Sequence, residues 1–387
     1  MSFRPNGATQ VLLLLTLMAG TTRSDELSGQ DRPPIAGRDQ WITDFTKYTV
    51  PLEEIASGGP PKDGIRAIDA PRFVNIKAAD RWLGDREPIA VVRAGGVTKA
   101  YPLRILIRHE IVNDVVGGEP ITVTYCPLCN TTLAFDRRYD GKLLDFGTTG
   151  RLRHSDLVMY DRQTETWWQQ ATGEGIVGQY AGERLTFIPA NVISWRDVKR
   201  QLPHAQVLSR ETGLYPPSTY GRNPYVGYDR GRGPIRQFFR FGKDDDRLPA
   251  MERVVALEDT EAEAYLAVPF SVLKDVRVAN VEVGSRNVVV FWTPGTASAV
   301  DKANMANGRD VGSSTTFDPV VDGRRLIFKE AGDGRFEDRQ TGSVWNLVGQ
   351  AVEGELEGTQ LTEVVHGNHF WFAWGVFRPE TKVWRGR

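Results

Sequence analysis

The chain of 387 residues has only two cysteines and five histidines, and its charges almost cancel. Its 48 basic and 49 acidic residues give a formal net charge of -1 and form no long runs of one sign. This balance argues against a nucleic-acid binder, because such proteins carry a basic face. A hydrophobic content of 40% with 10% aromatic residues is enough to build a large core.

Residues 1–24 have the pattern of a secretory signal peptide. Arg4 provides the positive charge, residues 11–17 form the apolar segment, and residues 19–22 are small residues before the cleavage site. The apolar segment is shorter than the roughly 20 residues that span a bilayer. We therefore expect a cleaved signal peptide, no membrane span in the mature chain, and a periplasmic or secreted location.

The remaining composition favours strands and turns over long helices. Thirty-nine glycines and 22 prolines interrupt short apolar runs, which is the pattern of β-strands and turns. We predict a mostly β fold, barrel-like or sandwich-like, with few short helices. The clearest helix candidate is residues 195–202, which Pro203 ends.

Self-similarity of the chain predicts an internal duplication. The sequence DRQT of residues 161–164 recurs at residues 338–341, and a tryptophan follows each copy, Trp168 and Trp345. Further glycine, leucine, tryptophan and proline positions match in register, which indicates two related β-rich repeats. The predicted organisation is a signal peptide at 1–24, an N-terminal extension at 25–84, a first repeat at 85–213, a linker at 214–249 and a second repeat at 250–387.

Both cysteines lie in one tetrapeptide of the first repeat, Cys126-Pro127-Leu128-Cys129. A disulfide across two intervening residues closes almost no loop and adds little stability, so metal binding or thiol–disulfide exchange suits the pair better. Strand-like residues 121–125 and 131–135 flank it, as in a metal-binding knuckle and unlike the helix start of redoxins. The second repeat has threonine in place of both cysteines, which indicates a site specific to the first repeat.

Two thiolates do not complete a metal site, so further ligands must come from other segments. His109 and His154 are the candidate ligands, because they flank the cysteines in polar segments. Asn113 and Asn130 are candidates for orienting these ligands through hydrogen bonds. Thiolates with imidazole favour copper or zinc as the cofactor, and iron stays open.

Four motifs carry a resemblance to a known family. They are YCPLCNTT at 125–132, FGTTGRL at 146–152, DRQTETWWQQ at 161–170 and GRNPY at 221–225. With these motifs the chain resembles the domain-of-unknown-function 3179 family of exported bacterial and archaeal proteins, over about residues 60–387. The resemblance implies a cysteine-centred site, and it implies no activity, substrate or metal.

Two other functions stay open at this point. The same cysteines are suited to a reversible disulfide in an extracytoplasmic thiol–disulfide oxidoreductase. Trp167 and Trp374 have no equivalents in the other repeat, so exposed rings there would suit a carbohydrate-binding module. Asp156, Asp161 and Glu165 are conceivable as paired carboxylates for hydrolysis, but their spacing is that of turn and cap residues. The sequence therefore leaves open whether the protein is an enzyme.

Overall fold

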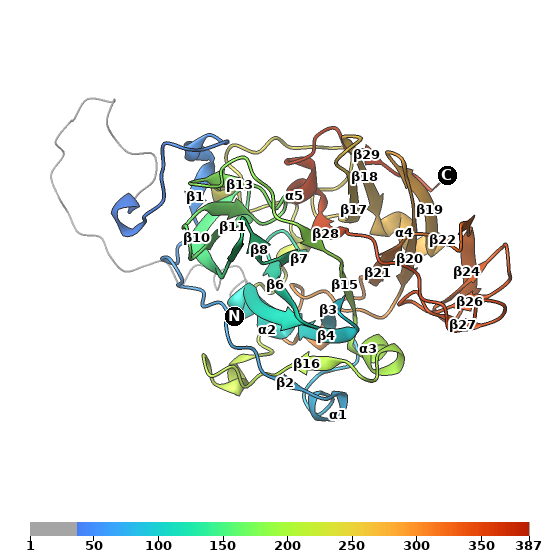
Figure 1. The fold of residues 1–387 in the computed structure, drawn as a ribbon. Helices are drawn as coiled ribbons and strands as arrows, with labels where there is room; N and C mark the ends of the chain where they lie inside the picture. Colours follow the sequence, from blue (N-terminus) through green and yellow to red (C-terminus); the bar gives the residue numbers. More distant parts are fainter. Residues whose placement is uncertain (1–36, 387) are drawn as a thin grey trace, which may run out of the picture. The chain divides into compact units, whose positions relative to one another are not determined.

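The computed structural model describes residues 37–386, so the predicted signal peptide lies outside the described residues. The described chain is mostly β, as predicted, and the longest of its α-helices has seven residues (Figure 1). The helix predicted at 195–202 is present as α3 (Trp195–Gln201). No helix among residues 37–386 is long and apolar enough to cross a membrane.

The two segments predicted as repeats contain the same order of elements, a hairpin, a short helix and a second hairpin with a third strand. In the first segment these are β3 (Pro88–Ala94), β4 (Val97–Pro102), α2 (Leu103–His109), β5 (Ile111–Val116), β6 (Glu119–Cys126) and β7 (Thr131–Asp136). In the second they are β17 (Arg253–Asp259), β18 (Ala264–Pro269), α4 (Phe270–Val276), β19 (Val278–Val283), β20 (Arg286–Thr293) and β21 (Ser313–Phe317). Both helices follow a proline, Pro102 or Pro269, and end at a residue with positive φ, Glu110 at 60° or Arg277 at 64°.

Each segment continues into four antiparallel strands. These are β10 (Phe146–Arg153), β11 (Asp156–Asp161), β12 (Trp167–Gln169) and β13 (Gly175–Val177), and then β24 (Phe328–Gly332), β25 (Arg335–Asp338), β26 (Val344–Trp345) and β27 (Ala351–Glu353). In both DRQT turns the aspartate accepts a hydrogen bond from an indole Nε1, Trp168 to Asp161 at 2.9 Å and Trp345 to Asp338 at 3.0 Å. The recurring sequence thus makes the same turn twice, and an origin by duplication stays a prediction.

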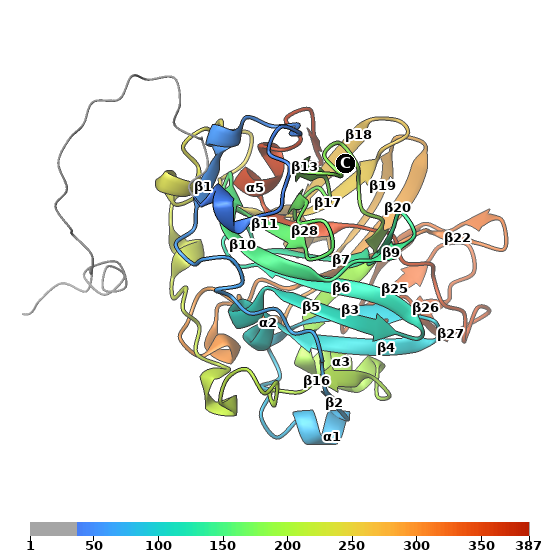
Figure 2. The same ribbon diagram turned by 60° about the vertical axis from the view of Figure 1, so that its left-hand side comes forward.

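Two large sheets combine strands of both segments. One has the order β29-β18-β17-β28-β7-β6-β5, in which β28 is Gly367–Phe370 and β29 is Lys382–Val383. The other has the order β19-β20-β21-β15-β3-β4-β16-β2, in which β2 is Phe73–Val74, β15 is Ala190–Ser194 and β16 is Gln206–Leu208. Figure 2 shows β7, β6 and β5 side by side. The segments join where Thr132 of β7 pairs with Asn368 of β28, and where Val192 of β15 pairs with Ser314 of β21. The two segments therefore share their sheets, while the predicted residue boundaries of the domains stay predictions.

Shorter elements complete the described chain. The other strands are β1 (Ile55–Ser57), which pairs with β10, β2 (Phe73–Val74), β8 (Arg138–Tyr139), β9 (Lys142–Leu143), β14 (Phe187–Ile188), β15 (Ala190–Ser194), β16 (Gln206–Leu208), β22 (Val320–Val321), β23 (Arg324–Arg325), β28 (Gly367–Phe370) and β29 (Lys382–Val383). The other helices are α1 (Ile76–Ala79), α5 (Trp371–Gly375) and the 3-10 turns η1 (Arg38–Gln40), η2 (Leu52–Glu54), η3 (Pro217–Thr219), η4 (Tyr228–Arg230), η5 (Arg236–Phe238) and η6 (Met305–Asn307).

The cysteine pair lies inside an apolar core cluster. Cys126 is 1% exposed and Cys129 is 0% exposed, and both pack in a cluster that includes Tyr125, Phe146 and Trp168. Electrostatic interactions and hydrogen bonds in such surroundings are strong, because water does not screen the charges there. The fold therefore places the cysteine turn where any charge must be balanced locally.

Candidate metal-binding site

The CPLC tetrapeptide forms the tight turn between β6 and β7. Cys126 ends β6 and pairs with Thr131 at the start of β7. Asn130, whose φ is 55°, closes the turn by donating its backbone N–H to the carbonyl of Pro127 at 3.3 Å. Asparagine tolerates this left-handed conformation better than most residues. The predicted position between two strands is confirmed, and both cysteines are free thiols.

Asp156 lies beside the two thiols. It is the first residue of β11 and follows a hairpin turn in which His154 and Ser155 have φ values of 52° and 69°. Two successive positive φ values are the mark of the hairpin turn that matches strand twist. One carboxylate oxygen of Asp156 and both sulfur atoms all lie within 4.8 Å of one another. Two separate hairpins therefore bring three potential ligands together.

The carboxylate of Asp156 is only partly satisfied by the protein. Its Oδ2 accepts hydrogen bonds from Gln169 Nε2 at 2.6 Å and from the backbone N–H of Ala171 at 2.9 Å. Its Oδ1 is buried and accepts no hydrogen bond of good geometry among residues 37–386, although the Cys129 thiol is near enough to the carboxylate to lower the pKa of Asp156. A buried polar atom without a partner is costly, so Oδ1 is suited to receive a cation.

The site gathers acidic groups that share a low-dielectric environment. Burial raises the pKa of Asp156 to about 6 and raises the pKa of Glu110, the residue after α2, to about 8, with a further contribution from the charge of Asp156. Burial also raises the pKa of Cys126 and of Cys129. At neutral pH both thiols therefore keep their protons. A bound divalent cation would displace these protons and stabilise the two thiolates.

A cavity of about 170 Å³ borders the cysteine turn. Leu128 of the turn lines it, together with Glu110, Arg151 and Tyr225. The cavity has room for several water molecules, since one water occupies about 30 Å³ of liquid. It therefore gives a small ligand a place next to the turn.

Neither predicted histidine ligand belongs to the group of sulfur and carboxylate atoms. Both ring nitrogens of His109 have other partners, with Nδ1 2.6 Å from the carbonyl of Arg66 and Nε2 2.7 Å from the hydroxyl of Tyr220. His154 Nε2 lies 3.2 Å from Glu54 Oε2. The rings of His109 and His154 therefore lie outside the group that Cys126, Cys129 and Asp156 form.

Asn113 connects two strands and does not orient a ligand. Its side chain donates to the carbonyl of Phe146 at 2.8 Å and accepts from the N–H of Phe146 at 3.0 Å. Asn280 makes the same pair of bonds to Phe328, both at 2.9 Å, in the segment without cysteines. This recurrence in the segment without cysteines favours a structural role for Asn113, and no hydrogen bond joins its side chain to Cys126, Cys129 or Asp156 among the described residues.

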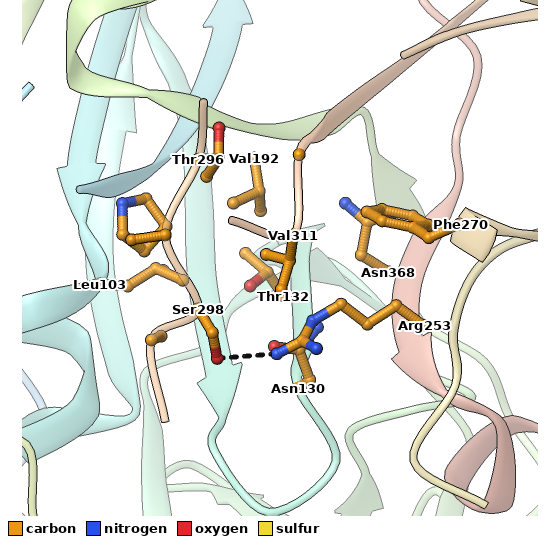
Figure 3. Close-up of a pocket in the computed structure, with 14 residues that line it drawn as sticks. Leu103, Asn130, Thr132, Val192, Arg253, Phe270, Thr296, Ser298, Val311 and Asn368 are labelled. Atoms are coloured by element: carbon orange, nitrogen blue, oxygen red, sulfur yellow. Dashed lines mark hydrogen bonds between the residues drawn. The ribbon is translucent and has the colours of Figure 1, made fainter. Parts of the chain in front are cut away.

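Asn130 lines a separate cavity at the junction of the two segments (Figure 3). The cavity has a volume of about 30 Å³ and is also bordered by Arg253, Ser298 and Asn368 of the second segment. Arg253 Nη2 donates to Ser298 Oγ at 2.9 Å, the bond drawn in Figure 3. The side chain of Asn130 therefore belongs to this junction.

The two tryptophans predicted to bind carbohydrate are buried. Trp167 is 0% exposed and packs against Trp41 and Phe45, with ring centroids 5.0 and 5.3 Å apart. Trp374 is 4% exposed and donates its Nε1–H to Thr381 Oγ1 at 2.9 Å. Neither ring offers a face to solvent, so the prediction of exposed sugar-stacking tryptophans is wrong.

Asp156 has little in its sequence surroundings that marks it as a ligand candidate. The one distinguishing feature of Asp156 in the sequence is its position directly before the apolar strand Leu157-Val158-Met159-Tyr160. An aspartate there is usually a turn residue, and the approach of this hairpin to the cysteines is a tertiary contact. Only the fold brings them together.

These features define a β-rich protein with a buried group of two thiols and a carboxylate. The chain belongs to the family described as protein of unknown function (DUF3179), whose profile matches residues 62–381, as the motifs predicted. No curated protein and no solved structure matches the chain.

Proposed function

We propose that Cys126, Cys129 and Asp156 bind one transition-metal ion. The observation that supports this is the approach of three ligand atoms within 4.8 Å, contributed by two separate hairpins. The unpartnered Oδ1 of Asp156 provides a lone pair for the ion. A carboxylate with two thiolates favours zinc over copper(I), because copper(I) prefers an entirely soft ligand set.

The ligand set leaves one coordination position for an exchangeable group. Zinc is usually four-coordinate, and three protein ligands with one open position are typical of its reactive sites. A cavity borders the same turn at Leu128 and Glu110, and none of the three proposed ligands lines it. We propose metal binding with one exchangeable position, and no particular reaction.

The proposal includes export of the protein, on the evidence of the predicted signal peptide. Adjacent free thiols in an oxidising compartment tend to form a disulfide, and a bound metal ion would keep them as thiolates. Thiol–disulfide exchange is the weaker candidate, because it needs an accessible thiolate. Burial raises the pKa of both thiols, and their exposure of 1% and 0% leaves a protein substrate no access.

Elemental analysis with a count of free thiols tests the proposal. The protein is purified from an export-competent host without chelator. We expect about one equivalent of zinc per chain, and its loss in Cys126→Ser and in Cys129→Ser. Asp156→Asn keeps the shape of the side chain and should weaken zinc binding at least about tenfold, or about 1.4 kcal/mol.

His109→Gln is the matched control, since the ring of His109 is bonded to Arg66 and Tyr220 and lies outside the group. This variant should retain its zinc, and circular dichroism should show that all variants fold. A metal-free protein with two oxidised cysteines would refute the proposal and favour the oxidoreductase. Unchanged zinc affinity in Asp156→Asn would remove the carboxylate from the ligand set.

A further inference from the structure

The second segment has a pocket at the position that corresponds to the cysteine turn. In the first segment the backbone N–H of Tyr125 donates to the carbonyl of Glu110 at 2.8 Å, and in the second that of Trp292 donates to Arg277 at 2.9 Å. Arg277 therefore takes the place of Glu110, and Trp292 that of Tyr125. The substitution of an acidic by a basic residue changes the kind of ligand that suits the position.

This pocket has the size and lining of a small-molecule site. Its volume is about 440 Å³, within the roughly 300–1,000 Å³ of typical ligand pockets. Phe270 at the start of α4, Trp292 at the end of β20 and Pro294 provide an apolar wall. Such a wall suits an apolar group, because contact with it removes apolar surface from water.

Basic side chains outnumber the carboxylates at the pocket. Of four basic groups that line it, Arg253 and Arg309 both bind the buried carboxylate of Asp229, at 2.7 and 2.9 Å. Lys274 has no ion pair within residues 37–386, and Arg277 has only a contact of 3.9 Å with Glu330. Among residues 37–386, Lys274 thus has no counter-charge, and Arg277 has a single long ion pair, with Glu330.

The two acidic residues at the pocket accept hydrogen bonds from backbone N–H groups. Glu252 Oε1 accepts the N–H of Ser271 at 2.8 Å. The carboxylate of Asp310 accepts the N–H of Gly295 at 2.9 and 2.8 Å. Neither is paired with Lys274 or Arg277, so both basic groups stay available to a ligand.

Two donors in the pocket wall lack an acceptor. Arg277 Nη1 and Trp292 Nε1 are buried atoms without a hydrogen-bond partner in the described part of the chain. The guanidinium lies 4.7 Å from the centre of the indole ring, and Trp292 is only 4% exposed. An unmade buried hydrogen bond costs about 1–3 kcal/mol, which an oxygen atom of a ligand would recover.

We propose that this pocket binds a small organic anion, whose carboxylate, phosphate or sulfonate group contacts Lys274 and Arg277. The apolar body of the ligand would contact Phe270 and Pro294 in the pocket wall. The site uses no residue of the proposed metal site, so it does not depend on metal binding.

Isothermal titration of the full mature protein with 2-naphthoate tests the proposal, with 2-naphthol as the uncharged counterpart and 2-naphthyl phosphate as a second anion. We expect saturable binding of at least one anion, at least about tenfold tighter than 2-naphthol and weaker at high salt. The tighter of the two anions identifies the preferred head group. Lys274→Gln and Arg277→Gln should each weaken its binding at least about fivefold.

Lys77→Gln is the matched control, because Lys77 is also an exposed lysine on a short helix without an ion pair. It should leave the affinity unchanged. Lys274 is exposed, so its variant should fold and gives a decisive result even if Arg277→Gln does not. Equal binding of naphthol, no saturable binding of either anion, or an unchanged affinity in Lys274→Gln would overturn the proposal.

Discussion

The buried carboxyl of Glu110 predicts an unusual dependence of stability on pH in the metal-free protein. Its pKa rises from an ordinary value of 4.5 to about 8 in the folded state. Below pH 4.5 the group is protonated in both states and costs nothing. Above pH 8 the group is ionised in both states. Since one pKa unit corresponds to about 1.4 kcal/mol, the folded state is then destabilised by roughly 5 kcal/mol relative to the unfolded state. Stability due to this group therefore falls between about pH 4.5 and pH 8.

Urea unfolding of chelator-treated protein at pH 5 and pH 9 measures the effect. Glu110→Gln removes the charge. The free energy of unfolding of this variant, measured relative to that of the wild type, should therefore increase by about 4 kcal/mol from pH 5 to pH 9. Glu261→Gln, at an exposed glutamate without an ion pair, is the control and should change little. If the difference between wild type and Glu110→Gln is the same at pH 5 and pH 9, the reasoning about this buried acid is wrong.

Two further predictions concern the framework. Asp229→Asn removes the negative charge that Arg253 and Arg309 share. Because Arg253 then stays buried without a counter-charge, denaturant unfolding should show a free energy of unfolding lower by about 3–5 kcal/mol. A decrease below about 1 kcal/mol would contradict this. Asn113→Ala and Asn280→Ala each delete two hydrogen bonds to a neighbouring backbone, and each should cost about 1–3 kcal/mol. Asn113→Ala also deletes the hydrogen bond from Asn113 Nδ2 to Asp69 Oδ1 at 2.7 Å, so its cost should be the larger of the two. A large cost at only one of them would argue against their equivalent roles.

Local features of the sequence predicted local structure well. The strand-like residues 121–125 and 131–135 on either side of the cysteines predicted two strands with a knuckle-like turn between them, and β6 and β7 are joined in this way. The recurring DRQT motif predicted a shared turn, because its aspartate, threonine and following tryptophan form one hydrogen-bonded unit. Because such hydrogen-bonded units are formed by residues close in sequence, they can be predicted from the sequence alone.

The site residues were predicted less well, since they depend on contacts between distant segments. His109 was favoured for its nearness to the cysteines along the chain, but it ends α2 and its ring is bonded to Arg66 and Tyr220. Asp156 has the sequence surroundings of a turn residue, and only the approach of one hairpin to another makes it a ligand candidate. Burial of Trp167 likewise comes from residues far away in sequence, including Trp41.

The sharing of sheets between the two segments has a consequence for the time course of folding. Thr131 beside the cysteine turn is bonded to His369, and 238 residues separate them; the carbonyl of Cys129 likewise receives the N–H of Phe370 at 2.8 Å. Contacts of such high sequence separation close slowly, because the entropy of a long loop is lost before they form. The cysteine turn should therefore reach its final surroundings late, after β28 has joined β7, and until then its thiols are open to oxidants and metal ions.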